Sequence, residues 1–400
     1  MKKEKEIYSY LAIYLTILLL FSYFFLYVKH QVGNDSTISE WLINYEGGFT
    51  KRGLIGQIAI EISRFFNLNL RFSIFLMQSF VCTVYFILLF NFLKNFKLER
   101  IVLLSIFTPI FILYPIAEIE VLARKEIIIF SLYLLYHLVP NQNIWKTFSF
   151  LIFTSLSILI WEPVIFFFPI IFILEVIEKN IKNYDLNLLK ILISFIPSLI
   201  IAYIFIFNPL NEMEWNVMAS ILKSEFNQRC YMSCGLLKTK SSIIQQFEGN
   251  YGKYSLEVFI RYLLIIFIGF YPLFTLIKNS KIKNNNLILF KYFKNFSKAL
   301  FLSLTPVILL FAMGYDWGRW VNISYVFLLI IFFQLLRQKK ITINYENIEN
   351  TFIYKLKKKT FIFFFIIFCF GWNPKTVITG DVASFPGYRI PYKVLKIMIN

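Results

Sequence analysis

Residues 44–57, NYEGGFTKRGLIGQ, combine charged side chains with several glycines just after the first long apolar stretch of the chain. Lys51 and Arg52 are suited to holding a phosphate group, because an arginine can donate two parallel hydrogen bonds to it. Glu46 is a candidate base for a hydroxyl group, and Tyr45 is a candidate binding residue beside it. Glycines allow a tight backbone path and close approach of a ligand; they are Gly47, Gly48, Gly53 and Gly56.

Three further segments place charged groups between apolar runs. They are AEIEVLARKE, with Arg124 and Lys125; ILIWEPVIFFF, with Glu162; and AMGYDWGRWVN, with Asp316 and Arg319. Charged groups at membrane depth cost free energy, so they normally face a partner or a wet cavity and often mark a substrate path. We expect these segments to meet the NYEGGFTKRGLIGQ loop in one pocket at one end of a helical bundle.

Glu162 is the lone charge between two apolar runs. Pro163 disfavours helical geometry at the residue before it, so Glu162 is expected at a break between two helices, with its carboxylate directed into a cavity. The alternative is a structural ion pair with one of the basic residues of the other segments. The alternatives for that partner are Arg124, Lys125 and Arg319.

The DWGRW turn allows two interpretations. In the functional one, Arg319 is a second phosphate clamp and Trp317 or Trp320 stacks on the face of a sugar. In the structural one, Asp316 pairs with Arg319 three residues later and closes a hairpin. The basic pair at 124–125 has a similar alternative, in which the side chains anchor the chain at the membrane interface by snorkelling.

A short amphipathic helix is expected after the glycine-rich loop. Gln57, Glu61 and Arg64 share one helical face, whereas apolar residues occupy the opposite face, which favours a helix lying in the membrane interface. It would border a lateral entrance for a lipid tail, or it would simply lead the chain back into the membrane.

The elements that must position these groups are apolar helices. Of the 400 residues 58% are hydrophobic, 48 of them Phe, and runs such as 7–28 have no charge and enough length to cross a bilayer. Alternating segments of about ten residues, as in a membrane β-barrel, do not occur. We therefore predict an all-α polytopic integral membrane protein, a single transmembrane domain over residues 1–400.

About eleven membrane spans are predicted from hydropathy. They are 7–28, 72–93, 101–116, 127–139, 147–161, 164–177, 190–207, 259–277, 299–314, 320–336 and 360–371. The pieces 101–116 and 127–139 are short enough to be half-helices around a re-entrant segment.

The charges predict which loops lie inside. Most of the 41 Lys and Arg fall in the segments that a cytoplasmic N-terminus puts inside, and most of the 23 Asp and Glu fall outside. The extracytoplasmic parts are then loops 29–71 and 208–258 and the tail 372–400. This distribution explains the net charge of +18 by topology, and no nucleic-acid partner is expected.

Cysteine and histidine give no metal pattern. Cys82 and Cys369 lie in apolar runs, whereas Cys230 and Cys234 share a polar loop and could form a disulfide if that loop faces an oxidising space. His30 and His137 are far apart, and the loops contain no glycine-rich phosphate cradle or DxD motif. We expect no metal and no cofactor.

At these residues the chain resembles the bacterial O-antigen and capsule repeat-unit polymerases and related GT-C-type glycosyltransferases. The resemblance rests on NYEGGFTKRGLIG with its acidic outer loop, on LARKE and WEP, and on YDWGRW. It implies a GT-C-like bundle in the bacterial inner membrane that transfers sugar without a metal on the periplasmic side. The donor would be a glycan on undecaprenyl diphosphate and the acceptor a lipid-linked repeat unit, with membrane lipid and a chain-length regulator protein as further partners.

The resemblance also implies roles for individual residues. Arg52, Arg124 and Arg319 would bind the departing diphosphate as its charge develops. Glu46 would deprotonate the acceptor hydroxyl, with Glu162 or Asp316 as rivals. The family commonly places an acidic residue in the first outer loop, and both Asp35 and Glu46 fit that position.

Other functions remain open. An enzyme that adds one sugar from a polyprenyl-phosphate donor would need the same clamp and carboxylate. A flippase or transporter of lipid-linked glycans should place charges near the midplane and on both sides of an alternating path. An acyltransferase would require a histidine base near a span end, and His30 is its only outward candidate.

Overall fold

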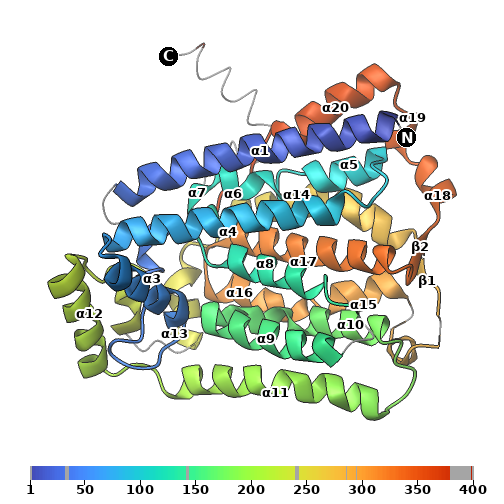
Figure 1. The fold of residues 1–400 in the computed structure, drawn as a ribbon. Coiled ribbons are helices and arrows are strands. Elements are labelled where there is room, and N and C mark those ends of the chain that lie inside the picture. The colour runs from blue at the N-terminus through green and yellow to red at the C-terminus, as the bar shows by residue number, and fades with distance from the viewer. Residues whose placement is uncertain are drawn as a thin grey trace.

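The computed structural model describes residues 2–31, 36–140, 144–238, 243–284, 286–293, 295–378 and 398. Within them the chain is mostly helical, and its strands are one antiparallel pair, β1 (Ser280–Ile282) with β2 (Ile341–Ile343). The longer helices are α1 (Lys2–Gln31), α4 (Leu70–Leu93), α9 (Ile144–Ile160), α11 (Leu186–Phe207), α14 (Leu256–Lys278) and α17 (Trp317–Arg337). They lie side by side with roughly parallel axes (Figure 1).

Shorter helical segments complete the bundle and its ends. They are α2 (Ser36–Ser39), α3 (Gly53–Phe66), α5 (Arg100–Phe107), α6 (Leu113–Ala117), α7 (Ile119–Leu122), α8 (Glu126–Tyr136), η1 (Glu162–Phe167), α10 (Phe168–Glu178), α12 (Glu212–Phe226), η2 (Gly235–Lys238), α13 (Ile243–Tyr251), η3 (Ile288–Lys291), α15 (Phe296–Leu302), η4 (Thr305–Val307), α16 (Ile308–Met313), α18 (Tyr345–Glu349), α19 (Phe352–Lys355) and α20 (Lys358–Phe370).

Six helical stretches of the described chain are long and apolar enough to cross a membrane, fewer than the eleven spans predicted. They are Tyr8–Gln31, Leu70–Leu93, Leu186–Phe207, Leu256–Lys278, Phe296–Met313 and Trp317–Arg337. The other five predicted spans correspond to helices of 17 residues or fewer, because Pro163 and several short irregular segments interrupt the apolar runs. The all-α membrane architecture is consistent with this structure, whereas the count of eleven is not confirmed.

The predicted piece 101–116 is divided into α5 and α6, whereas 127–139 corresponds to the single short helix α8. Side chains of α17 donate hydrogen bonds to the backbone of the divided piece. Between α5 and α6 the chain is irregular, which frees carbonyl oxygens that a membrane interior cannot hydrate. The Asn322 amide donates to the Ile110 carbonyl at 2.8 Å, and the Tyr325 hydroxyl donates to the Ser105 carbonyl at 2.6 Å. The apolar stretch of α17 is 94% buried, so this helix is the centre of the bundle.

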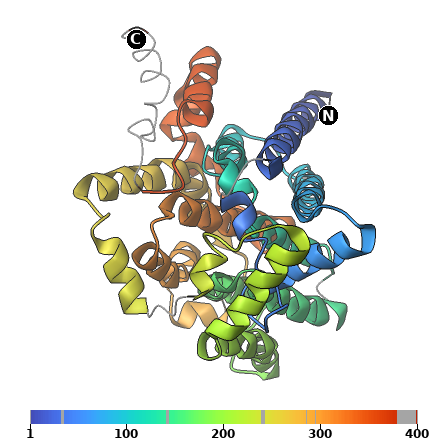
Figure 2. The same cartoon turned by 90° about the vertical axis from the view of Figure 1, so that its left-hand side faces the viewer.

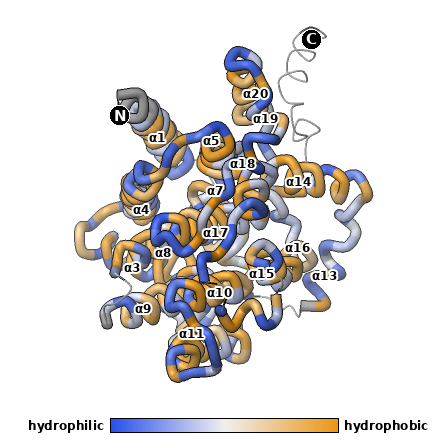
Figure 3. The backbone as a smooth tube through the Cα atoms, turned by 90° about the vertical axis from the view of Figure 1, so that its right-hand side faces the viewer, coloured by the Kyte–Doolittle hydropathy of each residue, from blue (hydrophilic) through white to orange (hydrophobic). Residues whose placement is uncertain are grey.

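The segments that the charge pattern assigns to the cytoplasm gather at one end of the bundle, at the right of Figure 1. There the ribbon β1–β2 joins the ends of α14 and α17, and Arg100 donates to the Ile353 carbonyl at 3.0 Å. Figure 3 views this end, where hydrophilic loops lie between the ends of mostly apolar helices. We call it the inner end and the opposite one the outer end, as the charge pattern predicts.

The outer end holds α3, α12 and α13, and Figure 2 shows α12 lying across the helix ends. The predicted amphipathic helix is α3, with Ala59 and Ile60 buried against the bundle. Phe65 and Phe66 are exposed on it, as expected for a helix that meets lipid. The disulfide Cys230–Cys234 lies beyond α12 in the same region.

Candidate functional site

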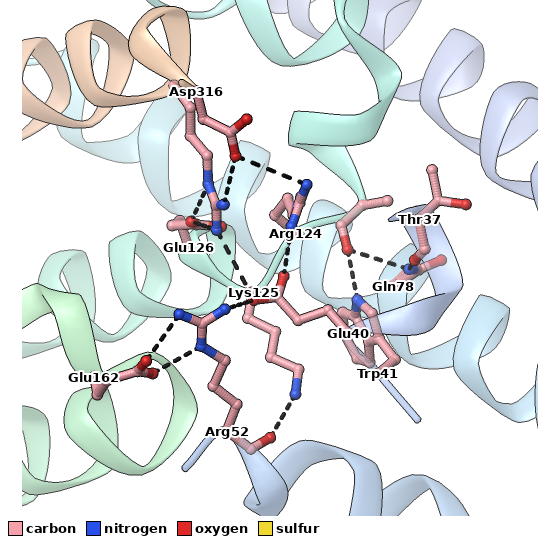
Figure 4. A network of polar contacts seen from close by, with 12 residues as sticks. Thr37, Glu40, Trp41, Arg52, Gln78, Arg124, Lys125, Glu126, Glu162 and Asp316 are labelled. Carbon is pink, nitrogen blue, oxygen red and sulfur yellow. Dashed lines mark hydrogen bonds and ion pairs between the residues drawn. The ribbon is translucent and has the colours of Figure 1, made fainter. Parts of the chain in front are cut away.

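Charged residues from separate segments meet at the outer end around Glu40, a residue that is completely buried (Figure 4). Glu40 directly follows α2, and buried Trp41 holds the turn in place by donating to the Ala123 carbonyl at 2.5 Å. Glu40 Oε1 accepts from Arg52 Nη1 at 3.1 Å, and its Oε2 lies 3.5 Å from Arg124 Nη1. Arg319 Nη2 lies 3.9 Å from Oε1, so three arginines share one carboxylate.

A second carboxylate holds Arg52 from the other side. Arg52 Nε donates to Glu162 Oε2 at 2.7 Å and Nη2 donates to Oε1 at 2.8 Å, and Lys51 Nζ lies 3.9 Å from Oε1. Helix α9 ends at Ile160 and η1 begins at Glu162, so the break predicted from Pro163 is confirmed. The alternative interpretation, a structural ion pair, is found, but the partner is Arg52 and not Arg124, Lys125 or Arg319.

Lys125 is fully buried within this network. Its ammonium group donates to the Arg52 carbonyl at 2.6 Å, and Arg52 has left-handed backbone geometry with φ 62°. Burial lowers the pKa of Lys125 to about 7, and the negative charge of Glu40 opposes this shift only in part. Lys125 thus fixes the backbone that presents Arg52, and its amine loses its proton far more readily than an exposed lysine does.

Arg319 lies in the first turn of the central helix α17, beside two stacked indole rings. Its guanidinium forms an ion pair with Glu126 at the start of α8, and its Nη1 donates to Asp316 Oδ2 at 3.3 Å. The guanidinium carbon lies 5.4 Å from the Trp161 ring centroid and 5.1 Å from that of Trp320. The predicted Asp316–Arg319 pair is therefore confirmed, as part of a larger network.

The two tryptophans expected to stack on a sugar are buried in the protein. Trp320 stacks on Trp161 with their centroids 5.9 Å apart. Trp317 packs among Tyr254 and other rings, and its indole nitrogen donates to the Phe311 carbonyl at 2.8 Å. In this conformation their faces contact protein groups.

The positive charges of the network lower the pKa of two of its carboxylates, Glu40 and Glu162, whereas burial raises the pKa of Glu126. Burial alone would raise the pKa of Glu40, but the positive charges of Arg124, Arg319, Arg52 and Lys125 outweigh it and lower the pKa to about 2. For Glu162 too, burial opposes ionisation, while Arg52 and Lys51 reverse the shift and lower the pKa. Four basic side chains, Arg52, Arg124, Lys125 and Arg319, face four acidic side chains, Glu40, Glu126, Glu162 and Asp316.

Glu46 lies outside this network, which alters the prediction that it acts beside the arginines. Its carboxylate accepts from Arg64 Nη1 at 2.7 Å and from Gln57 Nε2 at 2.8 Å. Arg64 also donates to Glu225 Oε1 at 2.7 Å, so this set ties α3 to α12. The hydrogen bond from Arg64 lowers the pKa of Glu46, which makes it a weaker base.

The glycines of the 44–57 loop make room for protein groups. A Cβ atom at Gly47 would fall well inside van der Waals contact with the Glu214 carbonyl of α12, and one at Gly56 would strike the Ile43 carbonyl. Gly53 lies against the ring of Tyr45, whose backbone N–H donates to Gln57 Oε1 at 3.0 Å. The close approach predicted for a ligand is thus made by the chain itself.

Sequence reasoning missed several residues of the site. Glu40 and Glu126 belong to the charged segments but were given no role from the sequence, and Trp161 was not considered. Yet Glu40 stands alone among the apolar residues of ISEWLI much as Glu162 does in its own segment. That isolation is the signal that could have identified it. Asp35 lies outside the described residues.

A second buried polar cluster lies at the inner end. Glu178 Oε1, on α10, accepts from Gln334 Nε2 of α17 at 3.1 Å and from Nε2 of Gln338, which directly follows α17, at 2.8 Å. Buried Lys146 lies 3.9 Å from Glu178 Oε2, and the His137 ring lies 3.8 Å from Oε1. A cavity of about 360 Å³ borders this cluster. No sequence motif indicated it, because its residues come from four separate segments of the chain.

Comparisons with protein-family models, with curated proteins and with solved structures found no match. The class of protein is therefore defined only by the fold and the site. The described chain is mostly helical, with apolar helices typical of a membrane protein, and a buried network of ion pairs lies at one end of the bundle.

Proposed function

We propose that the protein is a metal-independent glycosyltransferase of GT-C-like architecture in the bacterial inner membrane, which polymerises oligosaccharide repeat units carried on undecaprenyl diphosphate. One observation carries the proposal: Arg52, Arg124, Lys125 and Arg319 converge at the outer end from separate parts of the chain. Such a concentration of cations at the end of an apolar bundle suits a lipid-linked diphosphate.

The diphosphate would enter on the accessible side of the network. The side chains of Lys51 and Arg52 are 43% and 21% exposed, whereas that of Arg319 is only 4% exposed. In the proposed complex, a phosphate takes over the hydrogen bonds that Arg52 now donates to Glu162. The buried arginines behind it then stabilise the negative charge that develops on the departing diphosphate.

The transfer step balances without a metal. The oxygen of the acceptor hydroxyl attacks the anomeric carbon of the donor, the bond from that carbon to the phosphate oxygen breaks, and the electron pair leaves with the diphosphate. The hydroxyl proton passes to a carboxylate of the site. Asp316 and Glu162 are the candidates there, since the side chain of each is 21% exposed and lies beside the arginines. Glu162 suits this role once the phosphate has released it from Arg52.

Reconstitution tests the proposal. The purified protein in liposomes receives an undecaprenyl-diphosphate-linked repeat unit, and gel electrophoresis follows the products. A ladder of lengths supports polymerisation, one added sugar from a polyprenyl-phosphate donor supports the single-sugar transferase, and unchanged substrate with either donor rejects the enzyme. The variant Arg52→Ala should remove the ladder, whereas Arg229→Ala, an exposed arginine of the outer loop 208–258, should retain it.

A flippase for lipid-linked glycans is the second candidate, because the inner end also carries a buried charged cluster. Glu178 and Gln334 of that cluster lie on α10 and α17, so polar groups occur at both ends of the same bundle. Alternating-access transport needs groups of this kind on both sides of a path. The discriminating measurement is movement of a fluorescent lipid-linked glycan between leaflets in liposomes without any acceptor.

A further inference from the structure

A small basic cavity lies at the inner end, away from the network around Glu40. Its volume is about 210 Å³. Three lysines line it, namely Lys283, Lys339 and Lys340, together with the amides Asn180 and Asn284, and its apolar walls are Ile177, Ile282 and Leu287. No carboxylate lines it.

Backbone hydrogen bonds fix the lysines around the cavity. The ribbon β1–β2 continues by one bond, from the Lys283 N–H to the Lys340 carbonyl at 3.0 Å. Across the cavity, Asn284 donates to the Asn180 side chain at 2.7 Å, and the Ile288 N–H donates to the Ile181 carbonyl at 3.0 Å. The loops from α10, β1 and α17 are therefore joined, and the site is formed before any ligand arrives.

The charge of the cavity is positive. Among the described residues, Lys283, Lys339 and Lys340 have no carboxylate within ion-pair distance. The carboxyl ends of α10 and α17 lie nearby, and each helix end contributes about half a negative charge. Three ammonium groups exceed that contribution, so the cavity attracts an anion.

We propose that this cavity binds the phosphate of an anionic phospholipid headgroup. Lysine and asparagine side chains donate hydrogen bonds that phosphate oxygens accept, and clustered lysines beside membrane helices attract anionic lipids. Two exposed tyrosines, Tyr184 and Tyr292, contact each other in the adjoining loops, and exposed aromatic rings commonly lie at the level of the headgroups. The site is independent of the proposed sugar transfer.

Native mass spectrometry tests the site. The full-length protein is released from nanodiscs of mixed phosphatidylglycerol and phosphatidylcholine, and retained lipids are counted. The test variant is K283Q/K339N/K340Q, with asparagine at 339 because that residue has left-handed φ 56° and asparagine tolerates it. The matched control K357Q/K358Q/K359Q removes the same charge from the start of α20, at the same end.

We expect the test variant to bind phosphatidylglycerol roughly tenfold more weakly than the wild type does. The control should bind it like the wild type. Equal losses in both variants would mean diffuse attraction and would overturn the proposal, as would no loss in either. Release of the retained lipid by millimolar inorganic phosphate would instead assign the cavity to free phosphate and overturn the lipid assignment. Size-exclusion chromatography checks that both variants are folded before comparison.

Discussion

Arg52 and Glu162 form a two-point ion pair across 110 residues of sequence, with nitrogen–oxygen distances of 2.7 and 2.8 Å. This pair joins the glycine-rich outer loop to the break between α9 and η1. It also defines where the network opens, because both side chains are partly exposed while Glu40 behind them is not. A ligand phosphate that reaches the network meets this pair first.

Replacing Arg52 tests the phosphate clamp. We expect Arg52→Ala to lower the rate of sugar transfer by about 10²–10³-fold, the usual effect of removing one donor that stabilises a developing anion. Arg52→Lys should recover little of that rate, because an ammonium group cannot reproduce the two-point contact. The rate of product formation in liposomes is the measurement, and wild-type rates in Arg52→Ala would rule out the clamp.

Replacing Glu40 tests the core of the network. Glu40→Gln leaves three guanidinium groups without their shared countercharge, so we expect a loss of about 3–5 kcal/mol in stability. Thermal unfolding in detergent, followed by the loss of monodisperse protein, reports the change. The control is Glu61→Gln, since the Glu61 side chain is 59% exposed on α3 and its ion pair contributes little. Similar melting temperatures for both variants would mean that the network is not a structural core.

The lowered pKa of Lys125 predicts that the stability of the fold depends on pH. Burial lowers its pKa from 10.5 to about 7. Below pH 7 the amine is protonated in both states, so the folded protein carries the full cost of a buried charge. Between pH 7 and 10.5 the unfolded chain binds more protons than the folded protein does, and rising pH therefore stabilises the fold through this group.

The variant Lys125→Met removes that titration. Its stability relative to the wild type should be greatest below about pH 7 and should fall steadily as the pH rises toward 10.5. The difference in melting temperature, taken at matched pH, isolates this one group from the other titrating residues. A difference that does not change with pH would show that Lys125 keeps its ordinary pKa in the folded protein.

Three carboxylate variants locate the base. The sequence alone favoured Glu46, but the structure pairs Glu46 with Arg64, so we expect Glu46→Gln to retain most of the transfer rate. Asp316→Asn or Glu162→Gln should lower it by about 10²–10⁴-fold, depending on which of them accepts the proton. Loss of activity in Glu46→Gln alone would return the base to the first outer loop.

Gly47 tests the contact between the loop and α12. Gly47→Ala places a methyl group on the Glu214 carbonyl, so we expect it to displace α12 and lower the melting temperature. Gly249→Ala in α13 is the matched control, because nothing lies within 4 Å of its added Cβ. That control should be neutral or slightly stabilising, by up to about 1 kcal/mol. Equal melting temperatures would show that α12 is not held against the loop.

The sequence predicted the helical, apolar character of the fold better than it predicted where the individual helices begin and end. The runs at 7–28, 72–93 and 320–336 became long helices because no proline, glycine or charged residue interrupts them. The runs at 101–116 and 164–177 became short pieces, and their breaks depend on groups far away in sequence, such as Asn322, which satisfies the Ile110 carbonyl. Hydropathy averages cannot contain that information.

The candidate site was likewise predicted only in part. Arg52, Arg124, Lys125, Arg319, Glu162 and Asp316 were recognisable because charge is rare beside apolar runs, and they do meet. Glu46 lies apart from the arginines of the network because it binds Arg64, which also binds Glu225, 161 residues further along the chain. Which of several basic residues a given carboxylate binds is decided by the packing of the folded chain.

The central helix α17 carries Arg319 in its first turn and Gln334 near its last, about 22 Å apart along its axis at the usual rise of 1.5 Å per residue. Because the helix is rigid and enclosed on all sides, a sliding or turning motion that loosens Arg319 must also strain the amide contacts to Glu178. A ligand bound at one end of the bundle would thereby alter the side-chain contacts at the other end.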